Sequence, residues 1–343
     1  MKTEILNLDK TPYENGKKSG EFFQAPIRNT VRRYEQLIKD EKIWRKCSVI
    51  LDKLKAEYPA YYEEFMGKSD GAKVDYKAYF AMMCPEILNI SCNCTTITCK
   101  KENGSFLISH NEDDDYVENN FCISKINFSS GWLATNDTYN MPFGNGFSWN
   151  SFGIVKTINY CHEPNIIEEN LPRYFSQRHV SEAGSIEDLI KRCNELRPAS
   201  GYHMNALDVN RNIAVSIEVY PDSVNVEFID DSYVHTNHYL HKRYWNDLEI
   251  APGNNSLFRL EKAWEMFHQL QDRNIERIKS ILDYRDENDN YEYSIFQTRD
   301  DPYMTLVNFS FDMDDKDAVF IDAYVNNEKL KLNYDLSACA VVI

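Results

Sequence analysis

The spacing of hydrophobic and polar positions divides the chain into a helical first part and a strand-rich remainder. Apolar residues recur every three or four positions through residues 31–38 and 44–54, which predicts amphipathic helices. The same spacing predicts helices over 58–66 and 76–83, and we expect the polar residues 68–71 to separate these two. Residues 1–90 are therefore predicted to be mostly helical.

A start signal for the first helix stands near the N-terminus. Thr11 is followed by Pro12 and Glu14. A threonine N-cap, a proline in the first turn and a glutamate three residues after the cap form a capping box. We expect a helix to begin directly after Thr11.

The pattern changes at Cys94. Residues 94–99 are rich in threonine and isoleucine, which favours a strand. Asn103-Gly104 is a strong hairpin signal, and residues 105–109 are expected to return as the second strand, in a hairpin that spans Thr95 to Asp113. Further strands are predicted at 121–128, 152–160, 203–209, 213–219, 224–229, 304–312 and 318–325.

Helical patterns lie between these strands. We expect helices over 168–179 and over 185–196, the second capped by Ser185, and a helix pair over 256–270 and 274–284. Runs of strands with helix pairs between them indicate α+β layers, not a doubly wound parallel sheet.

Composition and charge narrow the classes of partner. The chain has 343 residues, of which 43% are hydrophobic, and a net charge of −16, which argues against a nucleic acid or an anionic membrane as the main partner. Residues 1–93 carry 16 basic and 14 acidic residues, and the rest carry 22 and 40. This asymmetry is either ordinary surface variation or a sign that two segments of unlike charge dock; exposed ion pairs would add little to such docking.

The termini and the cysteines bear on the compartment. The first residues lack an apolar signal-peptide core, and no uncharged run approaches 18 apolar residues. Nine cysteines is an odd number in a chain without a secretion signal. We expect free thiols, a cytoplasmic location and no membrane partner.

Three of the cysteines crowd together, which raises the question of a metal site. Cys92, Cys94 and Cys99 lack a second ligand pair at zinc-finger distance, and tetrahedral zinc prefers four ligands. His235 and His238 would complete a site only by folding. We expect no metal, and the ordinary role of a cysteine such as Cys99 is as a small buried thiol.

The residues after Cys94 resemble a known family. Cys94-Thr95-Thr96, the Asn103-Gly104 turn and His110-Asn111-Glu112-Asp113 are similar to the acyl-CoA:6-aminopenicillanic acid acyltransferase family of N-terminal nucleophile (Ntn) hydrolases. Further matches follow in the family's order, so the resemblance spans nearly the whole chain. They lie at Thr11 to Gly16 with Gly20, at 153–159, at His235 to His238, at Ser256-x-x-Arg259 and at 305–312.

The resemblance implies a fold and a maturation step. The fold would be the four-layer αββα sandwich of Ntn hydrolases. The chain would be cut between Asn93 and Cys94 into a helical segment, 1–93, and a catalytic segment, 94–343, which stay associated in one compact domain. Cys94 would then hold the nucleophilic thiol and, as base, its own α-amine, whose unperturbed pKa lies near 7.7–8.0. No cofactor is implied.

The resemblance also carries roles for other residues. Asn237 would donate its side-chain amide to the oxyanion; otherwise it is a turn residue. Asp113 would bind the α-ammonium or organise the precursor; otherwise it belongs to a solvated acidic loop. Arg299 stands where the family has a functional arginine, and Thr96 and Asn111 take supporting positions.

One residue departs from the family pattern. The family has glycine before the nucleophile, where this chain has Asn93. Self-cleavage needs an unusual backbone at the scissile bond, and asparagine is among the few other residues that tolerate positive φ. Asn93 therefore either keeps the cleavage, or slows or abolishes it; without cleavage Cys94 has no free α-amine.

These observations lead to one principal function and its alternatives. The principal hypothesis is hydrolysis of a small linear amide, such as an acyl-amino acid or a β-alanyl amide; acyl transfer from acyl-CoA is less favoured because no basic or glycine-rich phosphate site is visible. The alternatives are an uncleaved binding protein with the same fold and a thiolate metal module. The aromatic residues Tyr116, Trp132, Phe143, Phe147 and Trp149 either line the substrate pocket or belong to the core.

Overall fold

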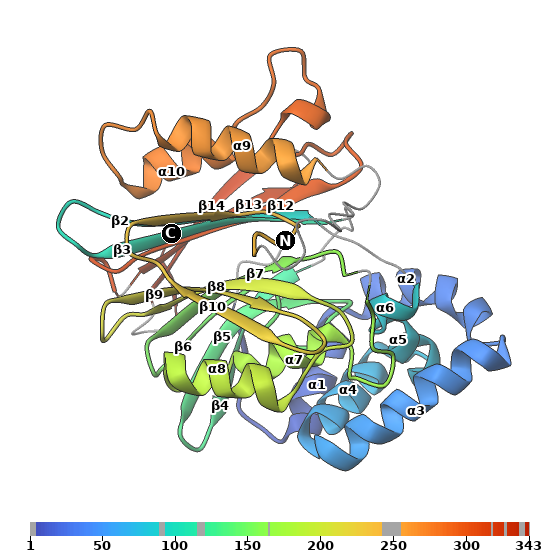
Figure 1. Ribbon diagram of the computed structural model, residues 1–343. Coiled ribbons are helices and arrows are strands. Elements are labelled where there is room, and N and C mark those ends of the chain that lie inside the picture. Colours follow the sequence, from blue (N-terminus) through green and yellow to red (C-terminus); the bar gives the residue numbers. More distant parts are fainter. Residues whose placement is uncertain are drawn as a thin grey trace.

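The computed structural model describes residues 5–88, 93–114, 121–163, 165–241, 255–316, 318–325, 328–335 and 340–342. These residues form four layers in the order helices, sheet, sheet, helices, with a helical bundle beside them (Figure 1). The layering is the αββα arrangement that the family resemblance implies, and the α+β class expected from the sequence pattern is confirmed.

The upper sheet in Figure 1 carries the hairpin that begins at Cys94. Its strand order is β11-β2-β3-β12-β13-β14-β15, and every neighbouring pair is antiparallel. The bounds are β2 (Asn93–Lys100), β3 (Phe106–Asp114), β11 (Ser232–His235), β12 (Met304–Asp312), β13 (Ala318–Val325), β14 (Glu328–Asp335) and β15 (Ala340–Val342). The predicted turn at Asn103-Gly104 is confirmed, with Gly104 at a φ of 87°. β3 continues five residues beyond the predicted end at Ser109.

The lower sheet has the order β1-β4-β5-β6-β7-β8-β9-β10. Its strands are β1 (Leu6–Leu8), β4 (Phe121–Phe128), β5 (Gly131–Thr138), β6 (Phe147–Asn150), β7 (Ile154–Tyr160), β8 (Tyr202–Asp208), β9 (Ile213–Val219) and β10 (Val224–Phe228). Six strands of the two sheets were not predicted: β1, β5, β6, β11, β14 and β15. A core of aromatic and branched side chains fills the space between the sheets, where Phe147 and Trp149 stack on Phe309.

Two helix pairs cover the outer faces of the sheets (Figure 1). α9 (Ser256–Phe267) and α10 (Ile275–Leu282) lie on the upper sheet, and α7 (Arg173–Val180) and α8 (Ile186–Glu195) lie on the lower one. Ser185 caps α8 as predicted. The prediction of a helix over 168–179 is wrong at its start: α7 begins only at Arg173, because the residue before Pro172 is biased away from helical dihedrals. A one-turn helix, Tyr291–Tyr293, lies in the loop before β12.

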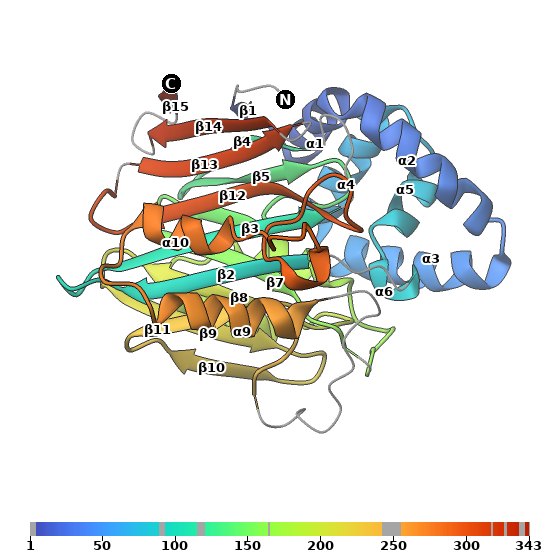
Figure 2. The ribbon, with the colours of Figure 1, turned by 90° about the horizontal axis from the view of Figure 1, so that it is seen from above.

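The first part of the chain forms the predicted helical bundle (Figure 2). Its helices are α1 (Pro12–Phe22), α2 (Gln24–Leu37), α3 (Glu41–Glu57), α4 (Pro59–Ala72), α5 (Tyr76–Met82) and α6 (Pro85–Leu88). The capping box at Thr11 and Glu14 is present, as predicted.

The predicted break at residues 68–71 is wrong, because α4 runs through them to Ala72. The cause is the packing of α4 on α1. A Cβ atom at Gly67 would lie 1.9 Å from the Tyr13 carbonyl oxygen, and one at Gly16 would lie 1.9 Å from that of Glu64. Gly20 and Gly71 approach the facing helix as closely. The glycines thus allow two helix backbones to touch, and this contact outweighs their low helix propensity.

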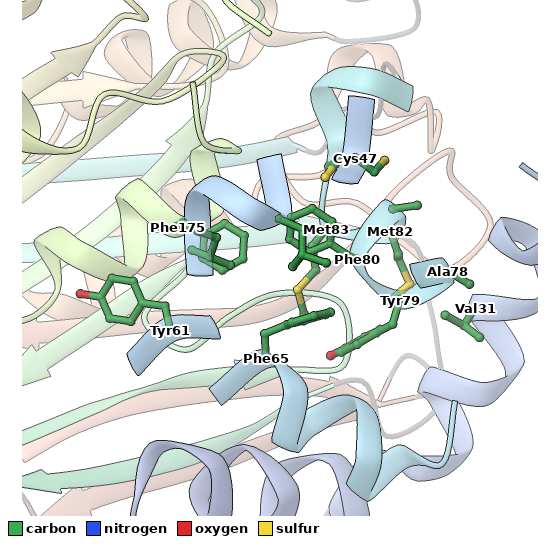
Figure 3. Close-up of a cluster of buried hydrophobic side chains, with 14 of the residues drawn as sticks. Val31, Cys47, Tyr61, Phe65, Ala78, Tyr79, Phe80, Met82, Met83 and Phe175 are labelled. Carbon is green, nitrogen blue, oxygen red and sulfur yellow. The ribbon is translucent and has the colours of Figure 1, made fainter. Parts of the chain in front are cut away.

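The core of the bundle extends into the second part of the chain. Phe65, Tyr79 and Phe80 pack together, and Phe80 lies against Phe175 of α7 (Figure 3). Residues on either side of Cys94 therefore share one hydrophobic core.

Two further links join the segments. β1 pairs in parallel with β4, so residues 6–8 contribute a strand to the lower sheet. Lys68 of α4 reaches Asp137 of β5 with an Nζ–Oδ1 distance of 2.7 Å, and both side chains are buried. Residues 1–93 are therefore more than a helical segment, although the predicted boundary at Cys94 stays a prediction.

No helix among the described residues is long and apolar enough to cross a membrane. Cys92 and Tyr116, which the sequence analysis considered for a metal site and a substrate pocket, lie outside the described residues.

Candidate active site

The hairpin register determines which residues surround Cys94. β2 and β3 pair so that Cys94 lies opposite Glu112, Thr96 opposite His110 and Asn93 opposite Asp113. Because side chains alternate along a strand, Cys94, Thr96, His110 and Glu112 share the face toward the lower sheet. Thr95, Asn111 and Asp113 share the face toward α9 and α10.

On the inner face, Thr96 connects the two sheets. Its hydroxyl donates to Asn159 Oδ1 of β7 at 2.7 Å and lies 2.8 Å from His110 Nδ1. Both side chains are fully buried. Thr96 therefore supports the hairpin next to Cys94, and its part in the chemistry stays a prediction.

His110 and Glu112 form a buried pair beside the nucleophile candidate. His110 Nε2 lies 2.9 Å from Glu112 Oε2. The Cys94 sulfur, a His110 nitrogen and a Glu112 carboxylate oxygen all lie within 4.8 Å of one another. The sequence analysis assigned no chemistry to His110 or Glu112. The signal was present, however, because counting back from the Asn103-Gly104 turn gives this register.

On the outer face, Arg259 of α9 holds the backbone of the nucleophile candidate. Its Nη1 donates to the Cys94 carbonyl oxygen at 2.5 Å and to Thr95 Oγ1 at 2.8 Å, and its Nε donates to Asn255 Oδ1. The guanidinium is fully buried. The sequence analysis noted Arg259 only as part of a motif and gave it no role.

Asn237, in the segment after β11, contacts the backbone near the start of β2. Its Oδ1 accepts from the Cys94 backbone nitrogen at 2.9 Å and from Arg259 Nη2 at 2.6 Å. Its Nδ2 donates to the Tyr160 carbonyl oxygen at 2.9 Å, and its backbone N–H donates to Ser256 Oγ. These partners fix the orientation of the amide: the oxygen faces the nitrogen that cleavage would convert into an amine.

Asp113 is fully buried, in contrast to the alternative of a solvated acidic loop. Thr305 donates its hydroxyl to Asp113 Oδ1 at 2.7 Å, while Oδ2 has no hydrogen-bond partner among the described residues. Burial raises the pKa of Asp113 to about 7, and the nearby Arg259 partly opposes this shift. The carboxyl can therefore change its protonation state close to neutral pH.

The other predicted site residues lie at different distances from this centre. Asn93 is the first residue of β2. Asn111 donates to the Leu282 carbonyl oxygen of α10 and accepts from Asn308 of β12, so it ties the hairpin to its neighbours. Arg299 is exposed in the loop before β12. The arginine that contacts Cys94 is Arg259, and the role of Arg299 stays a prediction.

The predicted alternatives for metal binding are separated by the fold. Cys99 points toward the helices, into a cluster with Val234 and Phe267, and burial raises the pKa of its thiol to about 12. His235 Nδ1 lies 2.8 Å from the Thr236 carbonyl oxygen, and His238 Nδ1 lies 2.7 Å from Ser256 Oγ. Neither histidine joins Cys94 and Cys99 in one cluster. Phe143, Phe147 and Trp149 are core residues, the second of the two alternatives stated for the aromatic set.

The sequence between residues 99 and 323 matches a family model, described as acyl-coenzyme A:6-aminopenicillanic acid acyl-transferase. This match covers about two thirds of the chain and includes Asp113, Asn237 and Arg259; Cys94 lies just before it. The chain belongs to this family. The resemblance inferred from the sequence is thereby confirmed.

Two solved structures are similar to this chain over part of its length. One is a variant of conjugated bile acid hydrolase from Clostridium perfringens, with 13% identity, a TM-score of 0.47, and coverage of 71% of this chain and 93% of that one. The other is the Caenorhabditis elegans ortholog of N-acylethanolamine-hydrolyzing acid amidase, with 12% identity, a TM-score of 0.43, and coverage of 64% and 93%. No curated protein sequence matches the chain.

Family membership and the four layers together define the class of the protein. It is an Ntn-type enzyme, of the amidohydrolase or acyltransferase class, with the αββα fold.

Proposed function

We propose that the chain is made as a precursor, is cut between Asn93 and Cys94, and then hydrolyses a small linear amide through an acyl-enzyme on Cys94. The observation that carries the proposal is the pair of hydrogen bonds that hold the Cys94 backbone. Asn237 holds its nitrogen and Arg259 holds its carbonyl oxygen, both from segments distant in sequence. A new N-terminus would therefore stay in place after cleavage.

The reaction needs a base, a nucleophile and a stabiliser of negative charge. The Cys94 α-amine takes the thiol proton, and the thiolate forms a bond to the amide carbonyl carbon. The C–N bond breaks, the departing amine receives that proton, and a thioester remains. Water then attacks the thioester and restores the thiol.

Three side chains support these steps. Asn237 Oδ1 orients the α-amine, and the second hydrogen on Nδ2 is the donor we assign to the oxyanion. One such donor is worth about 3–4 kcal/mol in the transition state. Arg259 keeps Cys94 in register, and Asp113, with a pKa of about 7, exchanges protons near the new terminus.

The choice between hydrolysis and acyl transfer depends on which molecule accepts the acyl group from Cys94. Water is always present, so hydrolysis of an acyl-amino acid, a β-alanyl amide or a similar compound is proposed ahead of transfer to an amine. An acyl-CoA thioester is the alternative acyl donor. No cofactor or metal takes part in the proposed steps.

The first test is the denatured intact mass of fresh protein, with N-terminal sequencing of any fragment. Two fragments, one of which begins Cys94-Thr95-Thr96, are expected. Cys94→Ala should leave the chain whole and inactive toward acyl amides. Cys99→Ala is the matched control, since Cys99 lies on the same strand and faces the helices; it should be cut and active.

A second candidate function rests on a different observation. A cavity of about 490 Å³ lies between α1, α4, β4 and α7, away from Cys94, and is lined by Tyr58, Tyr61, Phe128 and His179 among others. An uncleaved protein could bind a small molecule there without turnover. A wild-type chain that stays whole and inactive would favour this binding role over the enzyme.

A further inference from the structure

The proposed function leaves one step without a base. Before cleavage, the Cys94 nitrogen belongs to the Asn93–Cys94 peptide bond, and it donates its hydrogen to Asn237 Oδ1. An amide nitrogen has no basic lone pair, so the thiol cannot use it. The self-cleavage that creates the α-amine must therefore rely on another group.

The hydrogen bonds around His110 indicate which group can accept the thiol proton. The Thr96 hydroxyl donates to Asn159 Oδ1, so it accepts from His110, and His110 Nδ1 carries a hydrogen. His110 Nε2 and Glu112 Oε2, 2.9 Å apart, then need one more proton between them to form a hydrogen bond. The pair is thus either an imidazolium with a carboxylate or a neutral imidazole with a carboxylic acid.

The pair also faces the thiol. Cys94 and Glu112 lie directly opposite each other in the hairpin, and His110 shares their face. The sulfur, a His110 nitrogen and a Glu112 oxygen lie within 4.8 Å of one another, in a region that is closed to solvent around Cys94 and His110. In the first of the two forms, the positive imidazolium of His110 stabilises a thiolate on Cys94.

We infer that His110 and Glu112 form the base for self-cleavage, a role separate from that of the α-amine in turnover. The inference rests on the proposed function. Glu112 accepts the Cys94 thiol proton, while protonated His110 keeps a positive charge beside the thiolate. The thiolate bonds to the Asn93 carbonyl carbon, the peptide C–N bond breaks, and the departing nitrogen takes the proton as the new α-amine.

Water completes the reaction. It adds to the thioester between residues 93 and 94, releases segment 1–93 with a terminal carboxylate, and restores the Cys94 thiol. The same sulfur is thus served by two bases in succession: the pair on β3 once, and its own amine in every later cycle.

The experiment follows fragment formation in the full chain by denatured intact mass. Glu112→Gln keeps the size of the side chain and removes the carboxylate that would accept the thiol proton. Precursor should therefore accumulate, and cleavage should slow by about 10²-fold or more. His110→Ala should slow cleavage similarly, and added imidazole should accelerate that variant by about tenfold, which a merely structural role would not allow.

Thr98→Val is the matched control. Thr98 lies on the same face of β2 and accepts a hydrogen bond from Asn205 across the two sheets at 2.8 Å. The variant loses one buried hydrogen bond, as His110→Ala does, but Thr98 is four residues along β2 from Cys94 and contacts neither His110 nor Glu112 in the hydrogen bonds of that pair. It should be cut at the wild-type rate.

Two results overturn the inference and are distinguishable. If wild type is cut and both test variants are cut at the same rate, His110 and Glu112 are a structural pair while the proposed function stands. If wild type itself stays whole, the proposed function fails and the inference fails with it.

Discussion

Two fully buried aspartates, Asp137 and Asp113, have opposite surroundings. Asp137 Oδ1 accepts from Lys68, and its Oδ2 accepts from Ser19 at 2.7 Å and Ser124 at 2.9 Å. Asp113 accepts from Thr305 on one oxygen, and its other oxygen has no partner among the described residues. One carboxylate is saturated with donors, and the other is not.

The difference separates a structural joint from a reactive site. Lys68 uses all three of its hydrogens, on Asp137, the Thr138 carbonyl and the Met141 carbonyl, so the joint between α4 and β5 is complete. The charged form of Asp113 is instead poorly solvated, and its pKa is raised for this reason. Incomplete pairing of a buried acid is therefore the feature that marks the site, more than burial itself.

The largest expected effect comes from breaking the joint. Lys68→Met leaves Asp137 charged and without its cation, which should lower the free energy of unfolding by about 3–5 kcal/mol. Urea unfolding followed by circular dichroism measures this. The double variant Lys68→Met, Asp137→Leu should recover much of the loss; a single variant as stable as wild type would contradict the role of the pair.

The next effect concerns the helix contact beside the joint. Gly67→Ala places a Cβ 1.9 Å from the Tyr13 carbonyl oxygen, so α1 and α4 must separate, at a cost of about 3 kcal/mol. Gly184→Ala is the control, because its Cβ would meet only Phe152 at 4.0 Å, and it should change stability by less than about 0.5 kcal/mol. Equal melting temperatures for the two variants would refute the close packing.

At Asp113, removing the charge should raise the free energy of unfolding, the opposite of the effect expected at Lys68. Its pKa is about 7 in the folded chain against an ordinary 3.8, so its favourable contribution is complete below pH 4 and is lost as the pH rises to 7. In Asp113→Asn the buried charge is absent at pH 8, which should raise the free energy of unfolding by about 4 kcal/mol. Burying an amide N–H without a partner costs about 1–3 kcal/mol of this. The net expected increase is about 2 kcal/mol.

Urea unfolding of Asp113→Asn at pH 8 and near pH 4 checks the sign. The variant should be more stable than wild type at the higher pH, and this advantage should vanish at the lower one. Asp137→Asn is the matched comparison and should be less stable than wild type at pH 8, since it leaves Lys68 unpaired. The same sign for both variants would remove the distinction drawn here.

The smallest effect concerns an exposed pair between the same two segments. Lys46 of α3 lies 2.6 Å from Glu168, and both side chains are about half exposed. Lys46→Ala should cost less than about 1 kcal/mol, because water screens the pair. A loss as large as that of Lys68→Met would mean that charge complementarity, and not burial, holds the segments together.

Local signals were sufficient for much of the fold. The Asn103-Gly104 turn predicted the hairpin that brings Asp113 close to Cys94, and Thr11 and Ser185 predicted helix starts. Each of these depends on neighbours within a few residues. The order of helical and strand patterns indicated the α+β class, and the four αββα layers were implied by the family resemblance.

Features that depend on distant partners were missed. The polar residues 68–71, with Gly71, predicted a break, because the sequence does not show that α1 lies against this part of α4. β5 lacks the usual alternation because it carries Asp137, which bonds to α1 and α4. Arg259 reaches Cys94 only after α9 folds onto the upper sheet, so the Ser256-x-x-Arg259 motif alone did not reveal this contact.

The parallel pairing of β1 with β4 has a consequence for refolding. If the chain is cut before Cys94 as proposed, residues 6–8 occupy the edge of a sheet whose other strands belong to the second polypeptide. A unimolecular folding problem then becomes a bimolecular one. The two polypeptides of the cut enzyme would have to associate before β1 could pair again. The rate and yield of refolding from denaturant would therefore depend on protein concentration, whereas those of the uncut Cys94→Ala chain would not.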